Sequence, residues 1–279
     1  MITLLATAAV GFAFLFLVFR PLEVVFPANR GQRFFRPAWL TDLCFFLGHY
    51  LFWGLIVFWL LAQLRTGLDW LVPASFRAIV AAQPWWMQAV EVISLSDFFM
   101  YWGHRLQHRV GLLWRFHAIH HSVEHLDWLA AHREHPLDSI YTMTLINLPP
   151  MIAGFPLETI AGFLVFRGVW AAYLHCNVRL PIGPLRILLG APELHHWHHA
   201  NERDAGNYAN LCPLMDLIFG TYRCPDHEPE RFGIHQPTAR TYLGHMIKPF
   251  LPRESAQPGP DHAGFDASSS ERLRTPCEA

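Results

Sequence analysis

The stretch from residue 43 to residue 64, LCFFLGHYLFWGLIVFWLLAQL, runs for 22 residues without a charged side chain. An α-helix needs about 20 mostly apolar residues to cross the hydrocarbon core of a bilayer. Only a helix or a closed barrel can cross it, because every backbone polar group must be satisfied within the protein. Leu43–Leu64 therefore predicts a membrane-spanning helix.

Three further stretches have the same character. Ile2–Phe19 is uncharged and lacks the basic start of a secretory signal, so we expect a retained span and not a cleaved leader. Ser139–Cys176 is long enough to cross and return, with breaks expected at Leu148-Pro149-Pro150 and at Gly154-Phe155-Pro156. Trp85–Trp102 is long enough to cross but carries two acids. The sequence predicts five spans, or four if this last segment stays out of the membrane.

The composition agrees with a membrane protein. The chain is 52% hydrophobic and only 15% charged, whereas a typical soluble domain is about 25% charged. A net charge of −1 without any basic run gives no nucleic-acid partner. Five cysteines without CxxC spacing exclude the zinc-finger class.

The arginines predict the orientation. The loop between the first two spans carries Arg20, Arg30, Arg33 and Arg36, and positive loops stay in the cytoplasm. Under the five-span prediction, residues 104–138 and everything after residue 176 lie on that same side. The fold class we expect is all-α: a multi-span integral membrane helical bundle with a His-rich cap in the cytoplasm.

Histidines cluster in that cap. The stretch LHHWHHAN, residues 194–201, packs four of them into five residues, and two more clusters precede it. Helix positions i, i+3 and i+4 share one face. Eight imidazoles should therefore face together, while His196 and Trp197 point elsewhere; the eight are His104, His108, His117, His120, His121, His195, His198 and His199.

Such a set predicts a metal site. A catalytic zinc takes three protein ligands and a structural zinc takes four, so eight imidazoles suit two ions with open positions. Imidazole binds iron, zinc, copper and nickel alike. Iron is favoured here, because the substrates beside the membrane are lipids and cutting their inert C–H bonds needs redox chemistry.

Four segments carry a resemblance. They are HRLQH (104–108), WRFHAIHHS (114–122), ELHHWHHAN (193–201) and NYANLCPLMDLIFGTY (207–222). Together they resemble the fatty acid hydroxylase/sterol desaturase superfamily of membrane di-iron enzymes, which is marked by HxxxH, HxxHH and HxxHH boxes in that order. The similarity covers about Val92–Tyr222, roughly half the chain, and its motifs are specific as a set.

The resemblance implies an enzyme, a non-haem di-iron oxygenase. It would use two Fe ions, O₂ and electrons from a separate electron-transfer protein to hydroxylate or desaturate a lipid C–H bond. The eight histidines would be its catalytic metal ligands, and His175, in LHCN at the end of the last expected span, would be a ninth. The His-rich cap would then be the catalytic cap. It would face the cytoplasm, from the inner membrane of a bacterium or the endoplasmic reticulum of a eukaryote.

Three parts of the chain are expected. Residues 1–84 would form N-terminal transmembrane helices, and residues 85–224 a catalytic module that includes a transmembrane hairpin at 139–176. Residues 225–279 would be a C-terminal extension, disordered from about residue 253 because Ser, Pro, Gly and charge dominate it.

Several weaker candidates remain open. Asp97 and Tyr101 precede His104 at helical spacing, so Asp97 either orients a ligand imidazole or only ends a helix. His135, in AHREHPLD with His132, would be an extra ligand, a support for one, or a packing residue. Asn207 would bond a ligand or form a simple turn. Three histidines beyond the last box are expected to face solvent: His227, His235 and His245.

Two other functions compete with lipid oxidation. A His-rich membrane protein could bind or transport divalent metal, although the boxes lie at span ends and not along span interiors. A zinc hydrolase would need a general base such as the Glu of HExxH, which is absent. Sterol, fatty acyl, sphingoid and alkylglycerol lipids all stay open as substrates, with a slight preference for sterol-type relatives.

Overall fold

The structure, a computed structural model, describes residues 2–68, 70–201 and 206–252. The tail expected to be disordered lies outside these residues. Within them the chain is helical and forms no β-strand, only two isolated bridges, Pro27–Val178 and Ala200–Phe232. The expected all-α class is confirmed.

Within the described residues, five long helical segments form the frame, one of them made of two consecutive helices. They are α1 (Ile2–Val25), α2 (Trp39–Gly48), α3 (Gly54–Leu68), α5 (Trp85–Arg109), α7 (Pro136–Ile152) and α8 (Leu157–His175), with a π-helical turn at His49–Trp53 joining α2 to α3. The short helices are α4 (Ala74–Ala81), α6 (Gly111–His121), α9 (Arg186–Leu189), α10 (Pro192–His198), α11 (Leu214–Ile218) and α12 (Tyr242–Ile247). Single 3₁₀ turns lie at Ala130–His132, Gly183–Leu185 and Lys248–Phe250. Whether residue 84 ends a domain stays a prediction.

Among the residues that the structure describes, three helices are long and apolar enough to cross a membrane. They are Ile2–Val25, the continuous run Trp39–Leu68, and Leu157–His175. Each exposes most of its apolar side chains outward, as a lipid-facing helix does. The other two expected segments, in α5 and α7, are not among the three, and α7 has only 17 residues. The chain is a helical membrane protein, and the number of five spans stays a prediction.

The break expected at Pro149 and Pro150 is wrong. Helix α7 continues through both prolines to Ile152 and turns only after Gly154, whose φ is +82°. Pro150 has no N–H to bond the carbonyl of Ile146, four residues earlier. The hydroxyl of Ser96 on α5 donates to that carbonyl instead, at 2.8 Å. A neighbouring helix thus satisfies the group that proline leaves free, which is how membrane helices tolerate proline.

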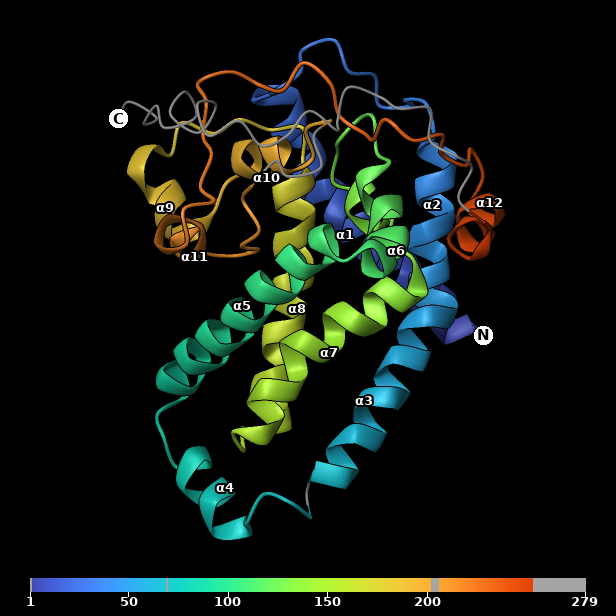
Figure 1. The fold of residues 1–279 in the computed structure, drawn as a ribbon. Coiled ribbons are helices and arrows are strands. Elements are labelled where there is room, and N and C mark those ends of the chain that lie inside the picture. The colour runs from blue at the N-terminus through green and yellow to red at the C-terminus, as the bar shows by residue number, and fades with distance from the viewer. Residues whose placement is uncertain (1, 69, 202–205, 253–279) are drawn as a thin grey trace.

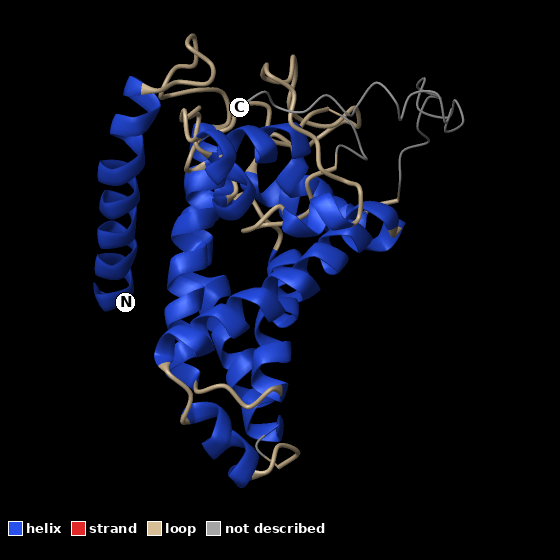
Figure 2. Ribbon diagram, turned by 90° about the vertical axis from the view of Figure 1, so that its left-hand side faces the viewer, coloured by secondary structure: helices blue, strands red, loops and turns tan. Residues whose placement is uncertain are grey.

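The long helices descend from a cap of short ones. Figure 1 shows α3, α5, α7 and α8 extending away from α6, α9, α10, α11 and α12. In the view of Figure 2, the N-terminal helix stands beside the others. It packs through aromatic contacts, with the Phe12 ring centroid 5.5 Å from Phe46 and 5.1 Å from Trp128. This packing holds the N-terminal helices against the loop that precedes α7.

Candidate metal centre

Nine buried or half-buried histidines gather in the cap as two groups. The ligand nitrogens within each group lie within 4.8 Å of one another. The five-histidine group is His104, His108, His117, His121 and His198. The four-histidine group is His120, His175, His195 and His199. These are the nine residues that the sequence and the resemblance pointed to.

Helix periodicity places them. His104 and His108 lie one turn apart near the end of α5, and His175 is the last residue of α8. Residues spaced i and i+4 on a helix lie one above the other. In α6 this pairs His117 with His121 in the five-histidine group, while His120 joins the other group. The face of three imidazoles expected for each HxxHH box is therefore divided between the two groups.

The third box is divided in the same way. His195 and His199 belong to the four-histidine group, and His198 belongs to the five-histidine group. Helix α10 ends at His198, which leaves His199 as its C-cap residue. Both α6 and α10 thus contribute to both groups.

Backbone carbonyls fix the tautomers of several imidazoles. His104 Nδ1 lies 2.8 Å from Tyr208 O, His198 Nδ1 2.7 Å from Gly206 O, and His175 Nδ1 2.8 Å from Ala171 O. His120 Nδ1 lies 3.2 Å from Arg133 O. A carbonyl only accepts, so each Nδ1 must carry the proton and donate it. The Nε2 lone pair of each of these rings then points into its group.

These inward lone pairs need a cation. His120 Nε2 and His175 Nε2 face each other at 3.1 Å, although both rings carry their proton on Nδ1. Neither can donate to the other, and two lone pairs at that distance repel. The Nε2 atoms of His121 and His198 are buried without a hydrogen-bond partner. A metal ion in each group would satisfy these nitrogens, so the residues fit the metal that the pattern predicts.

The imidazoles are in the protonation state that binds metal. Burial, reinforced by the neighbouring imidazoles, lowers the pKa of His121, His198 and His199 well below the usual 6.5. At pH 7 these rings are neutral, and neutral imidazole is the form that coordinates metal.

The sequence reasoning missed Asp138. His117 Nδ1 donates to Asp138 Oδ2 at 2.9 Å, and Gln107 Nε2 donates to Asp138 Oδ1 at 2.7 Å. A carboxylate on the outer nitrogen of a ligand imidazole fixes its orientation and raises its basicity. The segment HPLD, residues 135–138, was noted for His135, but its acid is the residue that reaches the site.

Asp97 has neither of the two expected roles. It lies inside α5 and accepts the backbone N–H of Leu211 at 3.1 Å and of Cys212 at 3.2 Å. It therefore ties α5 to the segment that leads into α11. Tyr101 lies 3.0 Å from the hydroxyl of Thr221, in that same region.

Asp216 supports the ligands indirectly. Its carboxylate accepts the N–H of Tyr208 and of Ala209, both at 2.8 Å. The carbonyl of Tyr208 is the acceptor for His104. Asn207, at φ +52°, braces the same segment by donating to Leu194 O and Arg223 O and bonds no ligand histidine. The acid and the asparagine thus hold in place the carbonyl that orients a ligand.

His196 and His135 lie outside both groups. His196 Nδ1 bonds Glu228 at 2.6 Å and its Nε2 bonds Cys176 O at 2.9 Å, so it turns away from the metal groups as the helical face predicted. His135 caps α7 by accepting the N–H of Leu137, which is a packing role.

His132 and the three histidines beyond the last box also lie outside the groups. His132 packs against Phe46, and burial lowers the pKa of its imidazole to about 3. His227 and His235 are exposed as expected. The expectation that His245 faces solvent is wrong, because it is buried with its ring centroid 5.7 Å from that of Phe45.

Comparisons with known proteins agree with the boxes. Residues 89–221 match the fatty acid hydroxylase family. An ornithine lipid hydroxylase of Rhizobium tropici is 32% identical over 171 residues, 59% of this chain and 52% of that protein. The human alkylglycerol monooxygenase is 34% identical over 143 residues, 50% of this chain and 32% of that protein.

A methylsterol monooxygenase of Arabidopsis thaliana is 29% identical over 130 residues, 46% of this chain and 49% of that protein. This chain thus spans about half the length of these relatives or less. No solved structure matches the chain. The family match includes the three histidine boxes together with Asp138 and Asp216, so residues 89–221 form a region of the fatty acid hydroxylase/sterol desaturase superfamily.

Proposed function

We propose that this protein is a membrane-bound di-iron oxidoreductase that uses O₂ and external electrons to hydroxylate or desaturate a C–H bond of a lipid. One iron would be held by the five-histidine group and the other by the four-histidine group. For hydroxylation the balance is one C–H bond, one O₂, two electrons and two protons giving one C–OH and one water.

One observation carries the proposal. Nine imidazoles converge in two adjacent groups with several lone pairs directed inward and no hydrogen-bond donor to meet them. Nitrogen-only sites of this size suit a borderline transition metal such as iron and leave positions open for a small ligand. Two irons would supply the activation of O₂ that the attack on an unactivated C–H bond requires.

The chain itself provides the frame. Tyr208 O, Gly206 O and Asp138 hold three of the imidazoles, His104, His198 and His117, in the tautomer that leaves Nε2 free for a metal. Burial of the groups keeps bulk water away from the reacting centre. The groups lie where the candidate spans end, for His175 is the last residue of α8. A lipid is therefore the substrate within nearest reach.

The relatives support a lipid substrate. By their names, they hydroxylate ornithine lipids or oxygenate alkylglycerols and methylsterols. For this chain we propose a membrane lipid with an aliphatic chain or ring as the substrate. A separate protein would deliver the electrons on the cytoplasmic side, where the arginine-rich loops are predicted to lie.

The decisive experiment is lipid mass spectrometry. Cells expressing the wild type or His198→Ala would be grown under heavy-isotope O₂. A lipid that gains labelled oxygen only with the wild type establishes hydroxylation and identifies the substrate. A lipid that loses two hydrogens without label establishes desaturation. Identical lipids in both strains would contradict the proposal. His235→Ala, on an exposed histidine, serves as the matched control.

Metal analysis separates the alternatives. The purified wild type should hold two irons per chain. Loosely exchanging divalent ions would instead favour a metal-transport protein, and one tightly bound zinc would favour a hydrolase.

A further inference from the structure

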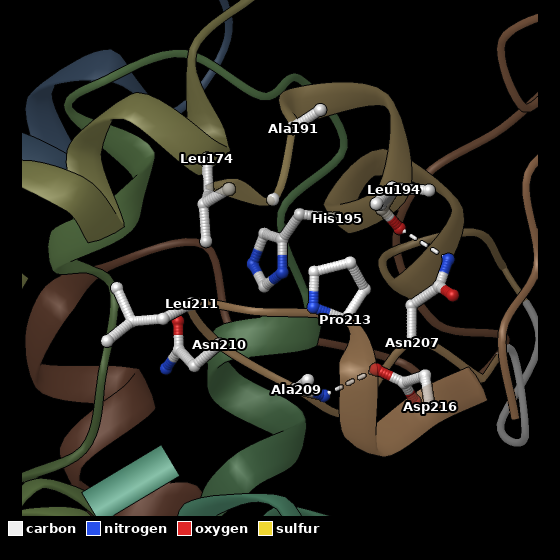
Figure 3. A pocket seen from close by; sticks show the side chains of 11 residues that line it. Leu174, Ala191, Leu194, His195, Asn207, Ala209, Asn210, Leu211, Pro213 and Asp216 are labelled. Atoms are coloured by element: carbon white, nitrogen blue, oxygen red, sulfur yellow. Dashed lines mark hydrogen bonds between the residues drawn. The ribbon is translucent and has the colours of Figure 1, made fainter. Parts of the chain in front are cut away.

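A small cavity adjoins the four-histidine group. Figure 3 shows the ring of His195 beside it. Its apolar walls come from three places: the end of α8, the start of α10 and the loop before α11. The residues are Leu174, Ala191, Leu194, Leu211 and Pro213. Its accessible volume is about 10 Å³, room for roughly one water molecule. The cavity thus links a ligand imidazole to the segments that carry α9 and α11.

Two segments that border this cavity touch each other. A Cβ on Gly190, directly after α9, would lie only 2.5 Å from the carbonyl oxygen of Leu211. The thiol of Cys212 lies 3.4 Å from the carbonyl oxygen of Ile187 in α9. Helices α9 and α11 are only four and five residues long. The segment before α11 is anchored to α5 by Asp97, so the movable side is the short helix α9, because short surface elements open at low free-energy cost.

The outer surface of the two short helices is apolar. In α9, Leu188 is 67% exposed, and in α11, Ile218 is 60% exposed, with Leu214 at 47%. Soluble surfaces rarely gather exposed apolar side chains in this way, whereas helices that lie in a membrane interface do.

This surface continues onto α5. The ring centroid of Phe219, directly after α11, lies 5.2 Å from that of Tyr101 and 4.8 Å from that of Trp102. Trp102 and Phe99 are exposed on the same helix. The apolar surface of α11 therefore extends along the helix that brings His104 and His108 into the five-histidine group.

We propose that α9 and α11 form the entrance through which a lipid reaches the metal centre from the membrane interface. The hydrocarbon chain would part the Ile187–Cys212 and Gly190–Leu211 contacts and follow the apolar walls to His195. The structure then shows the closed form, because a cavity the size of one water molecule cannot hold an alkyl chain. This inference rests on the proposed function for the identity of the substrate.

A covalent staple tests the entrance. The variant Ile187→Cys places a second thiol beside the native Cys212, and a short, reducible bifunctional thiol reagent would join the two. Mass spectrometry would measure the stapled fraction. The control Ile187→Cys/Cys212→Ser receives the same treatment, which corrects for reaction at the exposed Cys44. Each variant is compared with its own untreated form.

The first readout is lipid oxidation. Stapling should reduce turnover at least tenfold in Ile187→Cys, reduction should restore it, and the treated control should match its untreated form. Equal turnover before and after complete stapling would overturn the inference.

The second readout needs no catalysis. A phospholipid with a photoreactive acyl chain, presented in vesicles to the purified protein, should label the peptides that contain Leu174 and Leu211, and stapling should remove that label. Unchanged labelling after stapling would place the entrance elsewhere. If labelling responds to the staple while the wild type oxidises no lipid, the entrance stands and the proposed chemistry is wrong.

Discussion

His117 Nδ1, the ring nitrogen that points away from the metal group, donates a hydrogen bond to the carboxylate of Asp138. The Nδ1 atoms of His104 and His198 donate to backbone carbonyls instead. A carboxylate strengthens the donor more than a neutral carbonyl does, because the hydrogen bond is charge-assisted. His117 is therefore the ligand whose basicity depends most on a single side chain, Asp138.

Asp138→Asn should weaken iron binding. The amide oxygen can still accept from His117, so the ring keeps its place, but the negative charge is lost. Loss of such a partner lowers metal affinity by about 10- to 100-fold. Iron retained against increasing chelator would measure the change. Asp226→Asn, on an exposed acid, is the control, and equal iron retention in the two variants would show that the charge of Asp138 does not matter.

His196 and His198 should separate stability from metal binding. His198→Ala removes a ligand and should abolish activity. His196→Ala should keep both irons but lower the free energy of unfolding by about 1–3 kcal/mol, because it removes the hydrogen bonds to the carbonyl of the buried Cys176 and to Oε2 of the half-buried Glu228. Iron content and thermal unfolding would be compared. Equal iron loss in both variants would contradict the division of the α10 face.

At the scale of the element, the ligand helices bury neutral imidazoles that an unfolded chain would leave titratable. The folded pKa values of His121, His198 and His199 lie below the unfolded value of about 6.5. The unfolded chain therefore binds more protons below that pH, and stability is lost as pH falls.

The metal-free protein should accordingly become less stable on acidification. The contribution of the imidazoles to its free energy of unfolding should be constant with pH above about 7 and should fall as pH drops below about 6.5. Chemical unfolding of chelator-treated protein in detergent, measured between pH 8 and pH 5, would check this. Burial raises the pKa of Glu134 to about 8 and of Asp138 to about 7, which acts in the opposite direction. A stability that rises toward pH 5 would contradict the prediction and would mean that these carboxyls outweigh the imidazoles.

Much of this element-scale arrangement follows from the sequence. The i, i+3, i+4 spacing was enough to select eight of the nine imidazoles and to turn His196 away, because helix geometry is local. His175 followed only from the family resemblance. The division of each box between two groups depends on how α5, α6, α8 and α10 pack, which spacing alone does not contain. Asp97 shows the same limit of spacing. It has the expected helical spacing from His104, but the tertiary fold places the N–H groups of Leu211 and Cys212 against its carboxylate, so it does not orient a ligand imidazole.

At the scale of the whole molecule, the N-terminal helices reach the metal centre through buried charges. Asp42 in α2 binds Arg133 at 2.5 Å and Arg36 at 2.7 Å, and Arg36 also binds Asp127 at 2.6 Å. The carbonyl of Arg133 is the acceptor for the ligand His120. These N-terminal residues lie outside the family match at 89–221. Arg36 and Asp42, outside the matched region, thus help to position His120, a candidate metal ligand.

Asp42→Asn should therefore weaken iron binding from a distance. Removing one charge from a buried network leaves Arg133 undercompensated and costs about 3–5 kcal/mol. The orientation of His120 should loosen, and iron should be lost at lower chelator concentrations than in the wild type. The double variant Asp42→Asn/Arg133→Met, which removes both charges, should recover stability but not iron retention. Recovery of both would mean that the network serves stability alone.

With one ion in each group, as proposed, the division of the boxes would link the binding of the two ions thermodynamically. Helices α6 and α10 each contribute histidines to both groups, so the first ion to bind would order two helices that the second ion also needs. The conformational entropy lost in ordering these helices would be lost when the first ion binds, so the second ion would bind more tightly than the first. Native mass spectrometry during an iron titration should then show chains with no metal and chains with two, while the singly loaded species stays scarce. At metal concentrations below saturation, such a protein would consist of chains with both ions and chains with none.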